Sequence, residues 1–145
     1  MARIEKSIEI KTSPEKVWPM MFWDGWLKWY APFKKIEDTS KEKNKVGSTV
    51  HVTGELAGIK AEFDGEITEV IENEKGAWRT TGGNFTGFGF NTLSPTKDGT
   101  KVTIMIDYEL PYSILGKLID KVRFHKALDK SYDVGLKKLK GMLEK

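Results

Sequence analysis

Six short segments with strand periodicity, each separated from the next by a turn sequence, occupy the middle of the chain. They are residues 33–38, 47–56, 59–71, 76–82, 85–94 and 101–110. Small and turn-forming residues dominate the connections, as in Ala57-Gly58 and Lys97-Asp98-Gly99, and such residues favour tight hairpin turns. Because strands joined by short turns pair with their chain neighbours, the sequence predicts an antiparallel meander.

The segment before the meander combines a strand with interrupted helices. Isoleucines alternate with charged residues over residues 3–11, which predicts a half-buried first strand. Pro14 favours a helix start, but Pro19 cannot continue a regular helix because proline lacks the backbone donor. We therefore expect two short helical pieces, residues 14–18 and 20–30, the second broken around Gly25.

The segment after the meander predicts one long helix over residues 113–144. Its apolar residues fall into two groups. The earlier group, from Leu115 to Val122, points about 100° away from the later group, from Leu128 to Leu143. The helix therefore either breaks near residues 123–126 or touches two different surfaces.

Together these elements predict an α+β fold: a seven-stranded antiparallel curved sheet wrapped around a long C-terminal helix, with two short helices between the first two strands. A twisted sheet curls, and a single helix does not fill its concave side. We therefore expect a cavity between the sheet and the helix. Residues 1–145 are expected to form a single domain, because no linker or repeat divides the chain.

Four stretches of the sequence carry a family resemblance. They are the opening Ile8-Glu9-Ile10-Lys11-Thr12-Ser13-Pro14-Glu15-Lys16-Val17-Trp18, the segment from Asp24 to Trp29, Val46-Gly47-Ser48, and Tyr108-Glu109-Leu110-Pro111 followed by Gly116. With these motifs the chain resembles the START-like, or Bet v 1-like, helix-grip superfamily (SRPBCC), particularly its polyketide cyclase/dehydrase and lipid-transport-like members. The resemblance covers nearly the whole chain and implies the helix-grip fold. Pro19 departs from the uninterrupted first helix that is usual in that family.

The residue composition excludes several classes of site. The sequence contains no cysteine and only two histidines, His51 and His125. Disulfides, thiolate nucleophiles and cysteine-based metal sites are therefore excluded, and we expect neither a metal nor a cofactor.

Charge and hydropathy limit the expected partners. A formal net charge of +3 is too small to favour binding to nucleic acid. No apolar run reaches the roughly 20 residues that a membrane span needs, so we expect no stable membrane insertion. The N-terminal residues lack the apolar core of a signal peptide, and the expected location is therefore cytoplasmic.

Aromatic residues are concentrated in the interrupted helices between residues 18 and 33. They form either plain core at one end of the sheet or a lid that faces an apolar ligand. Gly87 and Gly89 leave one face of a strand bare, with room for a neighbouring backbone or a ligand. The predicted ligand-binding residues are Trp26, Trp29, Phe63, Trp78, Phe88, Tyr108, Leu118 and Val122.

Polar residues suited to catalysis are few. His51 and Glu55 share one face of their strand; they are solvated if that face is outward and form an acid/base pair if a bulge turns it inward. An inward Arg79 would anchor a ligand carboxylate. None of the three is a firm catalytic residue.

The function predicted first is therefore the binding of an apolar or amphipathic small molecule, lipid-like or polyketide-like, between the sheet and the C-terminal helix. Two alternatives stay open. One is a polyketide cyclase- or dehydratase-like enzyme that uses His51, Glu55 or Arg79 in the same pocket. The other is an interaction module related to the chaperone ATPase activators that share this fold.

Overall fold

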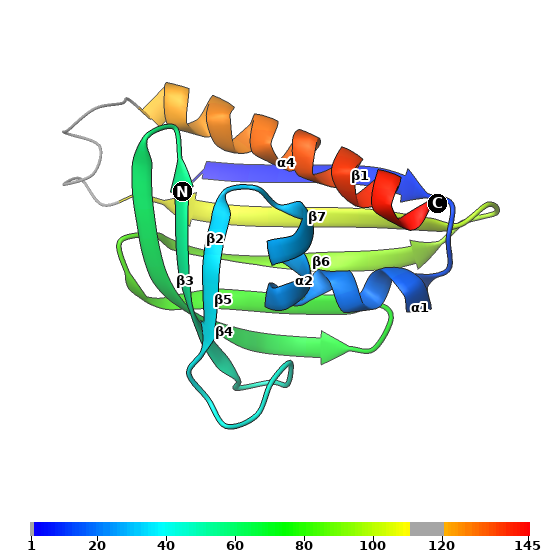
Figure 1. Ribbon diagram of the computed structural model, residues 1–145, viewed down its shortest axis with the longest axis horizontal. Coiled ribbons are helices and arrows are strands. Elements are labelled where there is room, and N and C mark those ends of the chain that lie inside the picture. The colour runs from blue at the N-terminus through cyan, green and yellow to red at the C-terminus, as the bar shows by residue number, and fades with distance from the viewer. Residues whose placement is uncertain (1, 111–120) are drawn as a thin grey trace.

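A computed structural model describes residues 2–110 and 121–145 (Figure 1). Within these residues the chain forms, in order, β1 (Ala2–Ile10), α1 (Pro14–Val17), the 3-10 helix η1 (Trp18–Met21), α2 (Trp23–Trp29), β2 (Phe33–Asp38), β3 (Thr49–Leu56), β4 (Ile59–Ile71), β5 (Lys75–Gly83), β6 (Thr86–Pro95), β7 (Thr100–Glu109) and α4 (Lys121–Leu143). The strands build one antiparallel sheet in the order β1-β7-β6-β5-β4-β3-β2.

Strands β2 to β7 form a meander, and β1 adds to its end beside β7. Each strand from β2 to β7 pairs with the next along the chain, and β1 pairs with β7, so that Ile4 lies opposite Ile106. The curved sheet, the long C-terminal helix and the short helices between β1 and β2 confirm the predicted helix-grip fold. Residues 113–120 of the predicted C-terminal helix lie outside the described residues.

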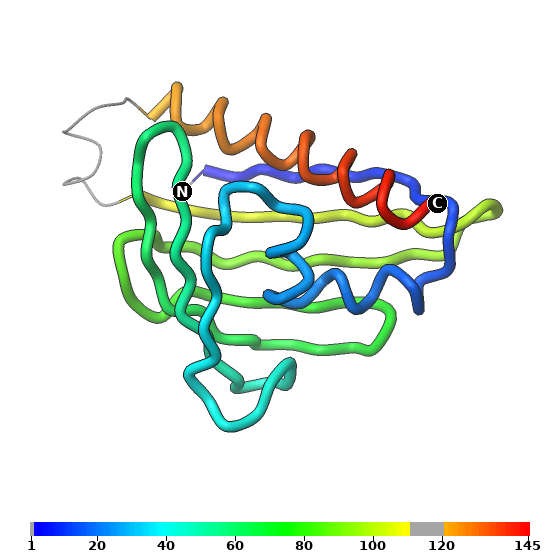
Figure 2. The backbone as a smooth tube through the Cα atoms, in the orientation of Figure 1, coloured from blue at the N-terminus to red at the C-terminus, as the bar shows by residue number. Residues whose placement is uncertain are grey.

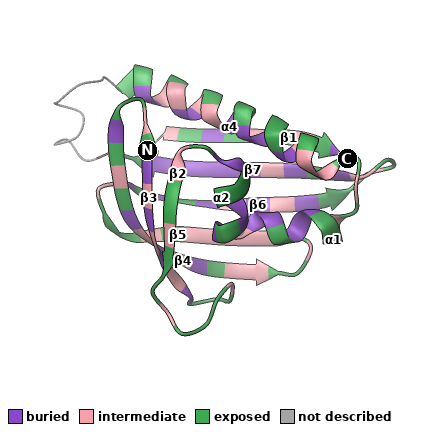
Figure 3. Ribbon diagram, in the orientation of Figure 1, coloured by how far each residue is buried: buried purple, intermediate pink, exposed green. Residues whose placement is uncertain are grey.

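The helices cover one face of the sheet. Figure 1 shows α4 running beside β1, with α1 and α2 on the same side of the sheet, and α2 contacts both α4 and β2. Along β7, Val102, Ile104 and Ile106 are buried, and they belong to the same apolar cluster as Leu128 and Leu139 of α4. Figure 3 shows β7 coloured largely as buried. The core therefore lies between the sheet and the helices, as the alternating pattern of β7 predicts.

α4 is continuous from Lys121 to Leu143, so it does not break near residues 123–126. Its buried side chains recur every three or four residues and form one stripe toward the sheet. These residues are Phe124, Leu128, Tyr132, Leu136 and Leu139. The described part of the chain contains no helix that is both long enough and apolar enough to cross a membrane.

The last turns of α4 are tied to the end of β1. The Lys140 Nζ atom donates to the carbonyl oxygen of Glu9 at 2.8 Å, and the backbone N–H of Lys11 donates to the Glu144 carboxylate at 2.8 Å. Figure 2 accordingly traces the C-terminus to a position beside the end of β1. These contacts hold the end of the helix beside the end of β1.

Two prolines and one glycine shape the segment between β1 and β2. Pro14 occupies the first turn of α1, which is only one turn long. The chain then continues as the more tightly wound η1, which contains Pro19. Gly25 does not break α2, contrary to the prediction, since the helix runs through it. A Cβ atom at position 25 would lie 2.5 Å from the Cα atom of Met20, so α2 requires glycine where it passes against the backbone of η1.

Candidate ligand-binding cavity

A cavity of about 100 Å³ lies between the sheet and the helices. Its sheet side is formed mainly by Ile59, Ala61, Phe63, Ile67, Trp78, Asn91 and Ile106. Its helix side is formed mainly by Met21, Phe22, Trp23, Trp26, Phe124, Leu128 and Tyr132, and the rest of its wall includes Tyr30, Phe33, Phe85 and Leu110. Almost every lining group is apolar, which is the composition of a site for an apolar molecule.

Glycines on the inner face allow two tryptophans to lie close to the sheet. A Cβ atom at Gly89 would lie 3.0 Å from the Trp78 indole, and a Cβ atom at Gly65 would lie 2.8 Å from the ring of Trp23. Both tryptophans line the cavity. The bare glycine face of β6 thus accommodates the Trp78 side chain and a close approach of the β7 backbone. Of these, only a neighbouring backbone was a predicted use of that space.

Trp26 connects α2 to the other walls of the cavity. Its ring centroid lies 4.3 Å from that of Trp29, 6.0 Å from that of Phe33 and 5.9 Å from that of Tyr132. These aromatic contacts link α2 to β2 and α4. The aromatic residues between β1 and β2 therefore belong to the core and at the same time form one wall of the cavity.

Two polar groups beside the cavity already have partners in the protein. The indole N–H of Trp29 donates to the carbonyl oxygen of Met20 at 3.0 Å. The hydroxyl groups of Tyr30 and Ser131 share a hydrogen bond of 2.8 Å, and burial raises the pKa of Tyr30. These groups help to hold η1, α2 and α4 together and need no ligand.

Two further polar side chains belong to the cavity wall itself. The Asn91 side-chain amide donates to the carbonyl oxygen of Met21 at 3.2 Å, which ties η1 to β6. The hydroxyl group of Tyr132 makes no hydrogen bond to a described residue, although Tyr132 is only 4% exposed. Burial raises the pKa of Tyr132 well above its ordinary value, so this hydroxyl is a neutral group at physiological pH.

Four of the eight predicted ligand-binding residues lie at or beside the cavity. Trp26, Phe63 and Trp78 line it, whereas Trp29 is 1% exposed and packs behind Trp26. Contact of these side chains with a ligand stays a prediction. Trp29 has its indole N–H and its ring committed to protein contacts, which places it in the core.

Phe88 lies on the outer face of the sheet, which corrects the prediction that it lines the pocket. Its side chain is 44% exposed. Gly87 and Gly89 on either side are buried, and neighbouring residues of a strand point to opposite faces. The register of β6 against β7 also pairs Phe88 with Asp107, whose carboxylate accepts two hydrogen bonds from Arg3 on the adjacent strand β1.

Two other predicted residues border a separate hollow. The hydroxyl group of Tyr108 hydrogen-bonds to the Nδ1 atom of His125 at 2.9 Å, and both residues line this hollow with Val122. Val122 is 62% exposed and is not part of the cavity wall, which corrects its assignment to the pocket. Leu118 lies outside the described residues.

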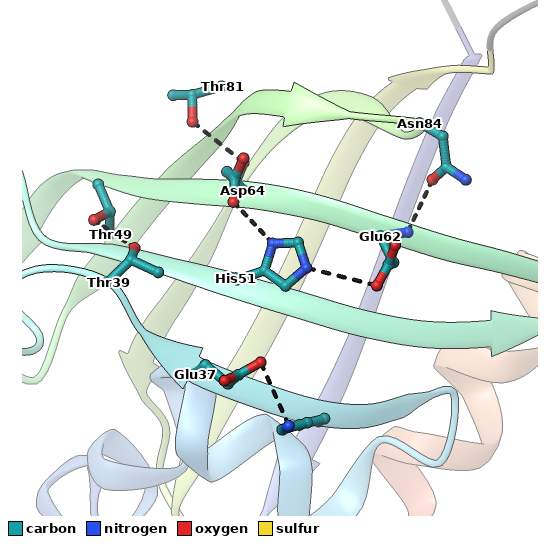
Figure 4. A network of polar contacts seen from close by, with 9 residues as sticks. Glu37, Thr39, Thr49, His51, Glu62, Asp64, Thr81 and Asn84 are labelled. Atoms are coloured by element: carbon teal, nitrogen blue, oxygen red, sulfur yellow. Dashed lines mark hydrogen bonds and ion pairs between the residues drawn. The ribbon is translucent and has the colours of Figure 1, made fainter.

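His51 lies on the outer face of β3 (Figure 4). Its Nδ1 atom is 2.9 Å from the Oδ1 atom of Asp64, and its Nε2 atom is 3.7 Å from the Oε1 atom of Glu62. Both carboxylates belong to the adjacent strand β4. The hydrogen bond with Asp64 raises the pKa of His51 above its ordinary value. The pair of His51 with Glu55, expected only if this face turned inward, is therefore not formed.

Glu55 and Arg79 do not supply inward-pointing catalytic groups. Glu55 borders the cavity at its rim, where it is exposed. The Arg79 Nε atom donates to Glu66 at 2.7 Å on the exposed side of the sheet. An Arg79 guanidinium in this position cannot anchor a carboxylate inside the cavity.

Several lining residues were absent from the predicted set. They include Met21, Phe33, Phe85, Phe124 and Tyr132. Tyr132 and Leu128 belong to the later apolar stripe of the C-terminal helix, so the sequence already indicated that they face the sheet. It did not indicate which part of that stripe borders open space.

A curved antiparallel sheet that grips a long C-terminal helix around an apolar cavity defines the helix-grip class of hydrophobic ligand-binding folds. Comparison with models of protein families assigns the chain to one family. It belongs to the family described as polyketide cyclase / dehydrase and lipid transport, whose model matches residues 1–144. This match confirms the resemblance found in the sequence.

Three similar proteins illustrate the relationship. An uncharacterized 17.2 kDa protein from the melC2-rnhH intergenic region of Streptomyces lincolnensis is 28% identical over 127 residues, 87% of this chain and 81% of its own length. The crystal structure of TTHA0849 from Thermus thermophilus has a TM-score of 0.80 and 21% identity, covering 98% of this chain and 97% of that one. The Zhui aromatase/cyclase from Streptomyces sp. R1128 has a TM-score of 0.78 and 14% identity, covering 99% and 93%. At these identities the two structures share the fold with this chain.

Proposed function

We propose that this protein binds an apolar or amphipathic small molecule in the cavity between the sheet and the helices. The observation that carries the proposal is the almost wholly apolar lining of that cavity. Removing apolar ligand surface from water stabilises a complex by about 25 cal/mol per Å² before the costs of association are subtracted. Membership of a family described by polyketide chemistry and lipid transport supports the same conclusion.

The size of the cavity limits how a ligand fits. Its volume of about 100 Å³ is smaller than the roughly 150 Å³ of an apolar protein cavity that binds benzene. A ligand larger than one ring therefore requires the lining to move, or extends out past the rim near Glu55. Met21 is suited to such movement because its flexible thioether side chain adapts to irregular shapes.

Binding is better supported than catalysis by the polar groups. The cyclase-like alternative was motivated by His51, Glu55 and Arg79, and two of these lie on the outer side of the sheet in ion pairs. The third is exposed at the rim. The interaction-module alternative stays a prediction.

Titration with the neutral fluorophore N-phenyl-1-naphthylamine tests the proposal. We expect saturable binding to the folded wild-type protein, with a fluorescence increase that reports transfer into an apolar site. Ala61 lines the cavity, so Ala61→Phe fills part of it and should weaken binding at least fivefold.

Lys60→Phe is the matched control, because it adds the same ring one residue away at an exposed position. It should bind the fluorophore like the wild type. The proposal fails if the wild type shows no saturable binding, or if folded Ala61→Phe and Lys60→Phe bind it equally well.

A further inference from the structure

Some hydrogen-bond donors around the cavity have a partner in the protein and others have none among the described residues. The indole of Trp29, the hydroxyl of Tyr30 and the side-chain amide of Asn91 are bonded to protein oxygens. The hydroxyl of Tyr132 and the indole N–H groups of Trp23 and Trp26 make no hydrogen bond to a described residue. The second group consists of residues that line the cavity and are more than nine-tenths buried.

Tyr132 is the most informative member of this group. It lies in the middle of α4, and its ring centroid is 5.9 Å from that of Trp26 and 5.4 Å from that of Tyr30. In the described residues, no polar side-chain atom is both fully enclosed and without a partner, so the unbonded Tyr132 hydroxyl retains a small accessible surface. Tyr132 is also one of the residues that line the cavity.

A donor that is almost wholly buried and has no acceptor in the protein is unfavourable, because it has lost most of its hydrogen bonding to water. Such a donor is satisfied when a bound molecule brings an acceptor oxygen to it. The cavity therefore has the polarity of a site for a ligand that accepts a hydrogen bond in otherwise apolar surroundings.

Charge further restricts that acceptor. Among the described lining residues there is no lysine, arginine or histidine, and the single carboxylate, Glu55, lies at the rim. An ionised carboxylate inside this cavity would have no cation to compensate the loss of its hydration. A fatty-acid headgroup is thus disfavoured at the position where a neutral carbonyl is favoured.

We infer that the ligand of this cavity is a neutral, largely apolar molecule with a carbonyl-type oxygen that accepts a hydrogen bond from the Tyr132 hydroxyl. This inference rests on the proposed binding function and specifies its ligand class. Ketones, quinone-like molecules and neutral esters belong to the class. Anionic fatty acids do not.

Three matched compounds test the inference by displacement of N-phenyl-1-naphthylamine at pH 7.5. They are 4-ethylacetophenone, 4-ethylcumene and 4-ethylbenzoate, whose acetyl, isopropyl and carboxylate groups have nearly the same shape. For the wild type we expect the ketone to bind at least a hundredfold more tightly than the carboxylate. Equal binding of ketone and carboxylate would overturn the exclusion of anions.

Tyr132→Phe isolates the hydroxyl group. We expect it to weaken binding of the ketone about three- to tenfold, the range for one neutral hydrogen bond, and to leave binding of the hydrocarbon unchanged. Tyr108→Phe is the matched control, because it removes a hydroxyl that borders the separate hollow and is already bonded to His125. It should alter binding of neither ligand. An unchanged ketone affinity in Tyr132→Phe, or equal losses for ketone and hydrocarbon, would refute the role assigned to Tyr132.

Thermal unfolding of the ligand-free variants gives a second measurement. Tyr108→Phe should lower the melting temperature, since it breaks the hydrogen bond with His125, whereas Tyr132→Phe should preserve or raise it. A clear decrease for Tyr132→Phe would mean that its hydroxyl has a partner in the protein, and the inference would fail. If the wild type does not bind the fluorophore at all, the proposed function fails. If it binds the fluorophore but Tyr132→Phe binds the ketone like the wild type, only the inference about Tyr132 fails.

Discussion

The contact between α2 and η1 makes Gly25→Ala a sharp test of the packing described above. An ideal Cβ atom at position 25 would lie 2.5 Å from both the Met20 Cα atom and the Pro19 carbonyl oxygen. Ordinary contacts between carbon atoms are about 3.5–4.0 Å, so the two backbones must separate by roughly 1 Å. Neither contact is with a flexible side chain, and rotamer changes cannot relieve them.

The expected loss of stability is the difference between two effects. Overpacking of a well-packed interior costs about 1–3 kcal/mol, and more when backbone must shift. Replacing glycine by alanine inside a helix recovers up to about 1 kcal/mol. We expect a net loss of about 2 kcal/mol, which for a chain of this size corresponds to a melting temperature lower by roughly 4–8 °C.

Gly141→Ala supplies the matched control. Gly141 lies near the end of α4, and a Cβ atom there would meet nothing within 4 Å. This variant should be as stable as the wild type or more stable by up to about 1 kcal/mol. Urea unfolding of the three proteins measures both differences, and a Gly25→Ala variant as stable as Gly141→Ala would refute the close approach of α2 to η1.

Three further predictions concern the core, the outer face and the cavity wall. Leu136→Ala removes a side chain from the buried stripe of α4 and should cost about 2–5 kcal/mol in chemical denaturation; a loss below about half a kcal/mol would mean that the stripe is exposed. The hydrogen bond with Asp64 raises the pKa of His51, so this contact should stabilise the fold below the unfolded-state value near 6.5, and its effect should disappear as pH rises through the raised folded-state pKa. NMR titration should accordingly give a lower pKa for His51 in Asp64→Asn, and an unchanged value would contradict the assignment. Hydrogen exchange should show residues 20–30 less protected than β7 in the free protein and slowed by N-phenyl-1-naphthylamine; equal protection of the two segments without the fluorophore would identify residues 20–30 as plain core.

Much of the fold could be predicted from consecutive residues alone. The bounds predicted for residues 33–38 and 59–71 agree with β2 and β4, because alternation and turn residues are local properties of the chain. Pro14 and Pro19 likewise fixed the interruption of the first helices through the covalent geometry of proline. The apolar stripe of α4 followed from helical periodicity in the same way.

The candidate site depended on relations between distant residues. Phe88 and Trp78 were both predicted to face a pocket, but the register places Gly89 opposite Trp78 and leaves Phe88 on the outer face. That register depends on the turn that joins β5 to β6, and a shift of one residue would reverse every side chain of the strand. The sequence therefore predicted that aromatic residues would line a cavity without fixing which of them do.

The partners of the polar groups were decided only by tertiary structure. His51 pairs with Asp64 of the adjacent strand and not with Glu55 of its own strand. The hydroxyl of Tyr30 is bonded to Ser131 of α4, whereas that of Tyr132 has no partner among the described residues. A hydrogen bond forms only when its donor and acceptor atoms lie about 2.5–3.2 Å apart, so small shifts between elements decide whether it exists. Periodicity assigns a residue to a face of its helix or strand, and packing of the elements against one another decides what that residue meets there.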